Sequence, residues 1–149
     1  MGGSINTSLK SLASGISISH SQWSEMKDHV ASRAPEEACG LVAGVGNQAR
    51  VIFPITNVLH DRFRFRMAPD EQLNAFLKAE EEGLDIIAIY HSHPHGIDHP
   101  SASDSAELSF PGVIYLIWYQ SGGQWQCCAY LMQAEEKPEE VAILISTNQ

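Results

Sequence analysis

Cysteine and long apolar runs are both scarce in this chain. Three cysteines occur among 149 residues, which is too few for the disulfide framework that stabilises many small secreted domains. We therefore expect reduced cysteines and a cytoplasmic location. No apolar run approaches the ~20 residues that a membrane-spanning helix needs, which argues against a membrane protein.

Positive charge is also scarce. Nine Lys and Arg residues stand against 18 Asp and Glu, and the net charge is −9 with neutral histidines. Because binding to nucleic-acid phosphates requires clustered Lys and Arg, we expect no nucleic-acid partner. Arg62, Arg64 and Arg66 alone cluster, and their alternation would place them on one face of a strand. That face is either a solvated surface or a dock for an acidic partner or a substrate carboxylate.

The length suits one domain with a single hydrophobic core. Residues 1–14 are rich in Ser and Gly and are expected to form a disordered leader, which leaves one domain over residues 15–149. Apolar periodicity predicts an α/β fold, a mixed sheet flanked by two main helices. The predicted strands are 15–20, 37–44, 50–54, 62–67, 84–90, 113–119, 125–131 and 141–145. The predicted helices are 21–34, 69–82 with an apolar stripe of Leu73, Phe76, Leu77 and the alanines between, and a short one at 101–108.

The pattern that carries chemistry is a pair of histidines followed by an aspartate. His91 and His93 end an apolar run, and on a strand their side chains point the same way. Asp104, a short loop later, can return as a third ligand. Three ligands of this type leave the fourth position of a tetrahedral zinc ion for water, which is typical of catalytic sites. Taken alone, a His-x-His pair is weak evidence for a metal, and Ser101 with an acid three residues later is also typical of a helix N-terminus.

Taken together, His91-Ser92-His93-Pro94 and, after six residues, Ser101-Ala102-Ser103-Asp104 resemble the motif of the JAMM metalloproteases. These are the metal-binding branch of the MPN domain family. The family also has an upstream E-x-x-G, and Glu37-Ala38-Cys39-Gly40 stands in that place. The resemblance covers roughly residues 20–131. It implies a cytidine-deaminase-like α-β-α sandwich and one zinc ion per chain, held by His91, His93 and Asp104 with water as the fourth ligand.

The resemblance also implies two catalytic residues. Glu37 would take a proton from the attacking water and return it to the leaving amine. Ser101 would donate a hydrogen bond to the oxyanion. Glu36, on the opposite side of a strand, would take no part. The structural alternatives are an exposed strand-end acid for Glu37 and a helix N-cap for Ser101, and the serine could serve both purposes.

JAMM proteins cleave peptide or isopeptide bonds, typically after the C-terminal glycine of ubiquitin or ubiquitin-like proteins. The compact members that this chain resembles release small ubiquitin-like modifiers or process sulfur-carrier proteins. The resemblance therefore implies a zinc-dependent metalloprotease, deubiquitinase- or desampylase-like, whose partner carries a Gly-Gly tail. Asp104 is followed almost directly by the next predicted strand, which argues against selectivity for a ubiquitin-chain linkage. Formation of a homo-oligomer remains open.

Three other interpretations remain open. The first is a non-catalytic MPN scaffold subunit, although such subunits usually lack a ligand and the set here is complete. The second is a RadC-like protein associated with DNA repair, against which the acidic charge argues. The third is a small-peptide or cell-wall amidase. His95 and His99, together with Asp98, could bind a second metal or shape the cleft.

Overall fold

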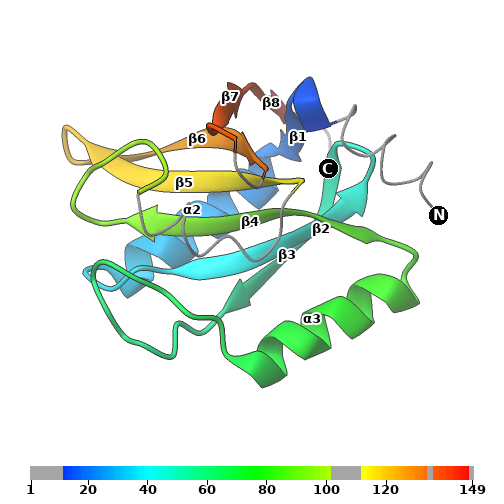
Figure 1. Ribbon diagram of the computed structural model, residues 1–149, viewed down its shortest axis with the longest axis horizontal. Helices are drawn as coiled ribbons and strands as arrows, with labels where there is room; N and C mark the ends of the chain where they lie inside the picture. The colour runs from blue at the N-terminus through cyan, green and yellow to red at the C-terminus, as the bar shows by residue number, and fades with distance from the viewer. Residues whose placement is uncertain (1–11, 102–111, 134–135, 148–149) are drawn as a thin grey trace.

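The computed structural model describes residues 12–101, 112–133 and 136–147. Its strands are β1 (Ile16–Ser19), β2 (Cys39–Val45), β3 (Gln48–Ile55), β4 (Asp85–His93), β5 (Val113–Ser121), β6 (Gln124–Met132), β7 (Glu139–Val141) and β8 (Ile143–Ser146). Its main helices are α2 (His20–Arg33) and α3 (Pro69–Glu81). The strands form one mixed sheet in the order β7-β6-β5-β4-β2-β3-β1-β8, with the two helices on opposite faces (Figure 1). This confirms the predicted α/β class. The helix predicted at 101–108 falls almost entirely outside the described residues.

Helix α2 packs on one face of the sheet through a short apolar stripe. Ser19 caps it: the Ser19 hydroxyl accepts from the Gln22 amide at 3.1 Å, and the Gln22 side chain accepts from the Ser19 amide at 2.9 Å. Met26 and Val30, one turn apart, are fully buried in the core on this face. Leu12 joins the same core at 2% exposure, so it packs with the domain although the leader was expected to include it.

Helix α3 packs on the other face, through only part of the apolar stripe that was predicted. Leu73 and Leu77 are 57% and 53% exposed, whereas Ala75 and Ala79 are buried. The predicted apolar stripe is therefore confirmed at its alanines and wrong at Leu73 and Leu77. Alanine side chains are short, so the helix can approach the sheet closely on that side while its leucines face outward. Within the described residues, no helix combines the length and apolar character needed to cross a membrane.

The segment predicted as one strand over residues 141–145 is two short strands, at opposite edges of the sheet. Only Ala142 separates β7 from β8, yet β7 pairs with β6 and β8 with β1. The Ala142 carbonyl also accepts from the Ile16 amide at 3.0 Å. The sheet therefore curves until its two edges approach each other at this segment (Figure 1).

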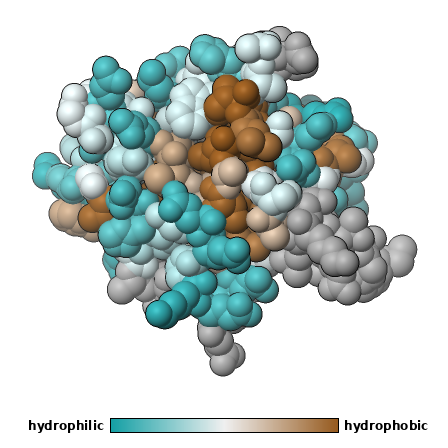
Figure 2. Space-filling model, turned by 90° about the horizontal axis from the view of Figure 1, so that it is seen from above, coloured by the Kyte–Doolittle hydropathy of each residue, from teal (hydrophilic) through white to brown (hydrophobic). Residues whose placement is uncertain are grey.

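The face seen from above shows a band of hydrophobic side chains between hydrophilic ones (Figure 2).

Residues 56–68, which connect β3 to α3, form a loop that we call the 56–68 loop. The strand predicted at 62–67 is wrong, because this segment makes only an isolated bridge between Asn57 and Met67. The Asn57 side chain accepts from the amides of Leu59 and Arg66, both at 3.1 Å. Side-chain bonds of this kind replace the backbone bonds that a strand ladder would use. Arg62, Arg64 and Arg66 consequently do not share a strand face.

Candidate active site

The two predicted histidines lie at the end of β4, on the face of the sheet that α3 covers. Strand alternation turns both side chains to this face, and Cys39 of β2 is the register partner of His91. Both imidazoles are buried, and their Nε2 atoms are 3.1 Å apart. Two nitrogens bound to one tetrahedral zinc at 2.0–2.1 Å would be separated by about 3.3 Å. The spacing of this pair therefore fits two ligands of a single metal ion.

The orientation of each imidazole is fixed by a neighbour. His93 Nδ1 lies 3.1 Å from the Ile97 carbonyl, which can only accept, so Nδ1 carries the proton. His93 Nε2 is then left with a lone pair that faces His91. Phe65 stacks on His91, with ring centroids 4.7 Å apart and an interplanar angle of 29°. Contacts of this type orient metal-binding histidines and set which nitrogen is free to bind.

The remaining predicted ligand, Asp104, lies outside the described residues. Within the described part of the chain, no group of three His, Cys, Asp or Glu side chains gathers around one point. Asp98 and His99 contact each other at 3.1 Å and are both mostly exposed. They do not join the histidine pair.

Glu37 is buried next to the histidines. It precedes β2, which begins at Cys39 rather than at residue 37 as predicted. Its exposed fraction is 3%, which excludes the alternative of an exposed strand-end acid. Glu36 differs, because its carboxylate is partly exposed and lies 3.2 Å from His60 Nδ1. The structure thus buries Glu37 beside the histidines and leaves Glu36 partly exposed, as expected.

Three bonds hold the backbone around Glu37. The Glu37 amide donates to the Asp61 carbonyl at 2.8 Å, and the Glu37 carbonyl accepts from Asn57 Nδ2 at 3.0 Å. The Ala38 amide donates to the Ser92 hydroxyl at 2.8 Å. Ser92 therefore has the structural role expected for a residue that faces away from the two histidines. The contributions of Asn57 and Asp61 were not predicted, since both residues lie in a loop without periodicity.

A pocket of about 240 Å³ opens beside these residues, and we call it the active-site pocket. Its lining residues are Glu37, Arg62, Phe63, His93, His95, Ile97 and Ser101. Phe63 and His95 stack within it, with centroids 4.9 Å apart. Three predicted site residues, Glu37, His93 and Ser101, thus meet at one pocket. Sequence reasoning missed Phe63 and Ile97, because only the folding of two separate loops brings them here.

A cysteine nucleophile is excluded at this site. Cys39 lies next to His91 on the neighbouring strand, which superficially suggests a Cys–His pair. Burial, with the Glu37 and Glu71 carboxylates adding to it, raises the pKa of the Cys39 thiol to about 12. The thiol therefore stays protonated at neutral pH, whereas nucleophilic attack requires the thiolate.

Comparison with known proteins identifies the family. The model of a family described as prokaryotic homologs of the JAB domain matches residues 19–143. The chain belongs to this family. This prokaryotic JAB protein is 34% identical over 103 residues to the desampylase of Haloferax volcanii, with 66% of this chain and 73% of the relative covered. It is 37% identical over 122 residues to the probable TtuB-protein conjugate cleaving protease of Thermus thermophilus, with 81% and 76% covered.

Solved structures agree with the fold. The solution structure of protein DSY2949 from Desulfitobacterium hafniense matches with a TM-score of 0.80 and 28% identity, over 89% of this chain and 94% of that one. A structure described as "JAMM: A Metalloprotease-like Zinc Site in the Proteasome and Signalosome" matches with a TM-score of 0.54 and 18% identity, over 88% and 97%. The resemblance to JAMM proteins and the sandwich fold that it implied are both confirmed.

Proposed function

We propose that this protein is a metal-dependent hydrolase that cleaves the amide bond after the C-terminal glycine of a ubiquitin-like or sulfur-carrier protein. One observation carries the proposal: two imidazole nitrogens 3.1 Å apart lie beside a buried carboxylate, at an open pocket. The names of the relatives, a desampylase and a probable TtuB-protein conjugate cleaving protease, support an enzyme that acts on protein conjugates.

In this proposal His91, His93 and Asp104 hold one zinc ion per chain. The tautomer of His93 and the spacing of the two Nε2 atoms fit such an ion, and the zinc site named for a structural neighbour supports the choice of metal. When bound, zinc polarises a substrate carbonyl and lowers the pKa of a bound water to about 7.

The side chains of the active-site pocket supply the remaining steps. Glu37 accepts a proton from the attacking water as its oxygen adds to the glycine carbonyl carbon. The same carboxyl group then gives that proton to the amine nitrogen as the carbon–nitrogen bond breaks. Ser101 donates a hydrogen bond to the oxygen that carries negative charge in between. A terminal glycine suits the site because it has no Cβ to obstruct a narrow approach.

The test is cleavage of defined substrates, read by mass spectrometry. Ubiquitin-like proteins with a Gly-Gly tail are joined through that tail to an α-amine or to a lysine ε-amine. We expect cleavage directly after the last glycine, loss of cleavage with a chelator, and recovery with added zinc. A substrate with valine as its last tail residue should resist cleavage. Equal rates for the glycine and valine tails would contradict the tail specificity, and cleavage that survives complete removal of metal would contradict the mechanism.

A further inference from the structure

The active-site pocket is lined by an arginine as well as by the proposed acid–base residue. Glu37, which in the proposed function protonates the leaving amine, lines this pocket together with Arg62. Atoms bonded to the leaving nitrogen would therefore enter a pocket that Arg62 also lines.

Arg62 has no acidic partner among the residues that the structure describes, although acidic residues outnumber basic ones two to one in the sequence. The adjacent Asp61 is engaged elsewhere, since its carboxylate accepts from the Phe63 amide at 2.7 Å. Among the described residues, Glu37 is the one acid that lines the pocket, and it is 3% exposed. A guanidinium in this setting is available to an anion that enters the pocket.

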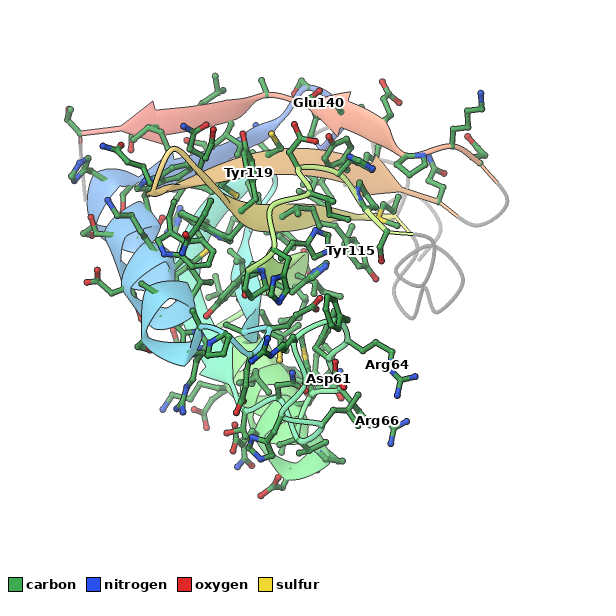
Figure 3. All side chains as sticks on the ribbon, turned by 90° about the vertical axis from the view of Figure 1, so that its left-hand side faces the viewer. Asp61, Arg64, Arg66, Tyr115, Tyr119 and Glu140 are labelled. Atoms are coloured by element: carbon green, nitrogen blue, oxygen red, sulfur yellow. The ribbon has the colours of Figure 1, made fainter. Side chains whose placement is uncertain are left out.

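The backbone on both sides of Arg62 is held in place. Asp61 is bonded to the Glu37 amide at 2.8 Å, and Phe63 stacks on His95 across the pocket. Arg64 and Arg66, by contrast, project away from the body of the protein (Figure 3). Of the three arginines in the 56–68 loop, Arg62 alone lines the active-site pocket.

We propose that Arg62 binds the free α-carboxylate of a single amino acid that is the leaving group, an inference that rests on the proposed function. The carboxylate of such a residue is one carbon away from the leaving nitrogen, about 2.5 Å by standard backbone geometry. A lysine ε-amine instead places four methylene groups between the nitrogen and its backbone. The pocket, at about 240 Å³, is smaller than the roughly 300–1,000 Å³ of sites for drug-sized ligands, which suits one residue. Arginine matches a carboxylate with two parallel hydrogen bonds.

The test compares two substrates that differ in one charge. A ubiquitin-like protein ending in Gly-Gly is extended by one alanine, prepared as the free acid and as the C-terminal amide. Wild-type kcat/KM should be roughly tenfold higher for the acid, because a charge-assisted hydrogen bond contributes on this order after screening by solvent. Arg62→Gln should reduce the acid-to-amide ratio to about one. Arg64→Gln, the matched control at a side chain that points outward, should keep the wild-type ratio.

Binding provides a second measurement that does not depend on turnover. The Glu37→Gln protein should bind the acid roughly tenfold more tightly than the amide, as measured by Kd. The double variant Glu37→Gln/Arg62→Gln should bind both equally. If neither substrate is cleaved while the Kd ratio depends on Arg62, the proposed function fails and the carboxylate site stands. A wild-type ratio of one in both measurements would overturn the inference. A ratio that persists in Arg62→Gln would also overturn it, because the carboxylate would then be bound elsewhere.

Discussion

At the scale of single residues, Asn57 connects the 56–68 loop to the backbone that carries Glu37. Its amide group donates to the carbonyls of Glu37 at 3.0 Å and Arg64 at 3.1 Å. Its oxygen accepts from two further loop amides. Asn57 is 6% exposed, so water cannot easily replace these bonds. One buried side chain therefore links the loop that carries Arg62 to the proposed acid–base residue.

Asn57→Ala should lower both stability and turnover. Leaving buried partners unsatisfied costs about 1–3 kcal/mol, and release of the loop should disturb the position of Glu37. Urea unfolding and kcat measure the two effects. Asn47→Ala is the matched control, because it removes a side-chain bond to the Gly15 carbonyl in a different part of the fold and should leave kcat unchanged. Normal turnover in Asn57→Ala would show that the loop does not position the site.

The sequence predicted the residues whose place depends on local pattern. The spacing of His91 and His93 at the end of an apolar run placed both on one strand face, and the resemblance picked out Glu37. The sequence could not predict that Phe63 and Ile97 line the pocket, because their approach to it depends on two loops that follow no period. Asn57 was missed for a related reason: one of its bonds reaches Glu37 in a separate segment, and the others lie within a loop that follows no period.

At the scale of elements, Gly40 of β2 leaves room for the ring of Tyr90, its register partner on β4. A Cβ at Gly40 would lie 2.2 Å from Tyr90 Cε2, closer than side-chain atoms can come. Tyr90 is fully buried, and its hydroxyl lies 2.7 Å from His29 Nδ1 on α2. The glycine of the E-x-x-G pattern thus makes room for a ring that links the sheet to α2.

Gly40→Ala should destabilise the protein by about 1–3 kcal/mol, the usual cost of overpacking a core. The buried ring has little room to move away from the added methyl group. Urea or thermal unfolding measures the change. Tyr90→Phe keeps the ring and loses the hydroxyl contact with His29, so it separates packing from hydrogen bonding. Wild-type stability in Gly40→Ala would mean that the ring can shift, contrary to this account.

The contact between α2 and β4 also predicts a pH dependence. Burial, followed by the positive charge of Arg33, lowers the pKa of His29 below its usual 6.5. The unfolded chain then takes up the proton at a higher pH than the folded protein, so stability falls as the pH drops below about 6.5. The difference in unfolding free energy between wild type and His29→Gln should therefore shrink from about pH 7.5 to about pH 5. A difference that stays constant or grows on acidification would contradict the assigned direction.

At the scale of the whole molecule, the closure of the sheet was the feature least accessible from the sequence. Alternating apolar residues predicted a strand near residues 141–145, but no local signal indicated its division at Ala142. The two halves pair with β6 and β1, which are distant from each other in the sequence. The layers themselves were predictable, because helix and strand periods are local. The order of the strands depends on contacts between distant segments.

The whole molecule, in this account, places one acid–base carboxylate beside a metal-binding histidine pair. The most direct test measures zinc content and turnover of Glu37→Gln against Glu36→Gln, on a substrate that the wild-type protein cleaves. Both variants should hold one zinc ion per chain. Glu37→Gln should lose on the order of 10²–10⁴-fold in kcat, whereas Glu36→Gln should match the wild type. Wild-type turnover in Glu37→Gln, or inactivity in Glu36→Gln instead, would contradict the account.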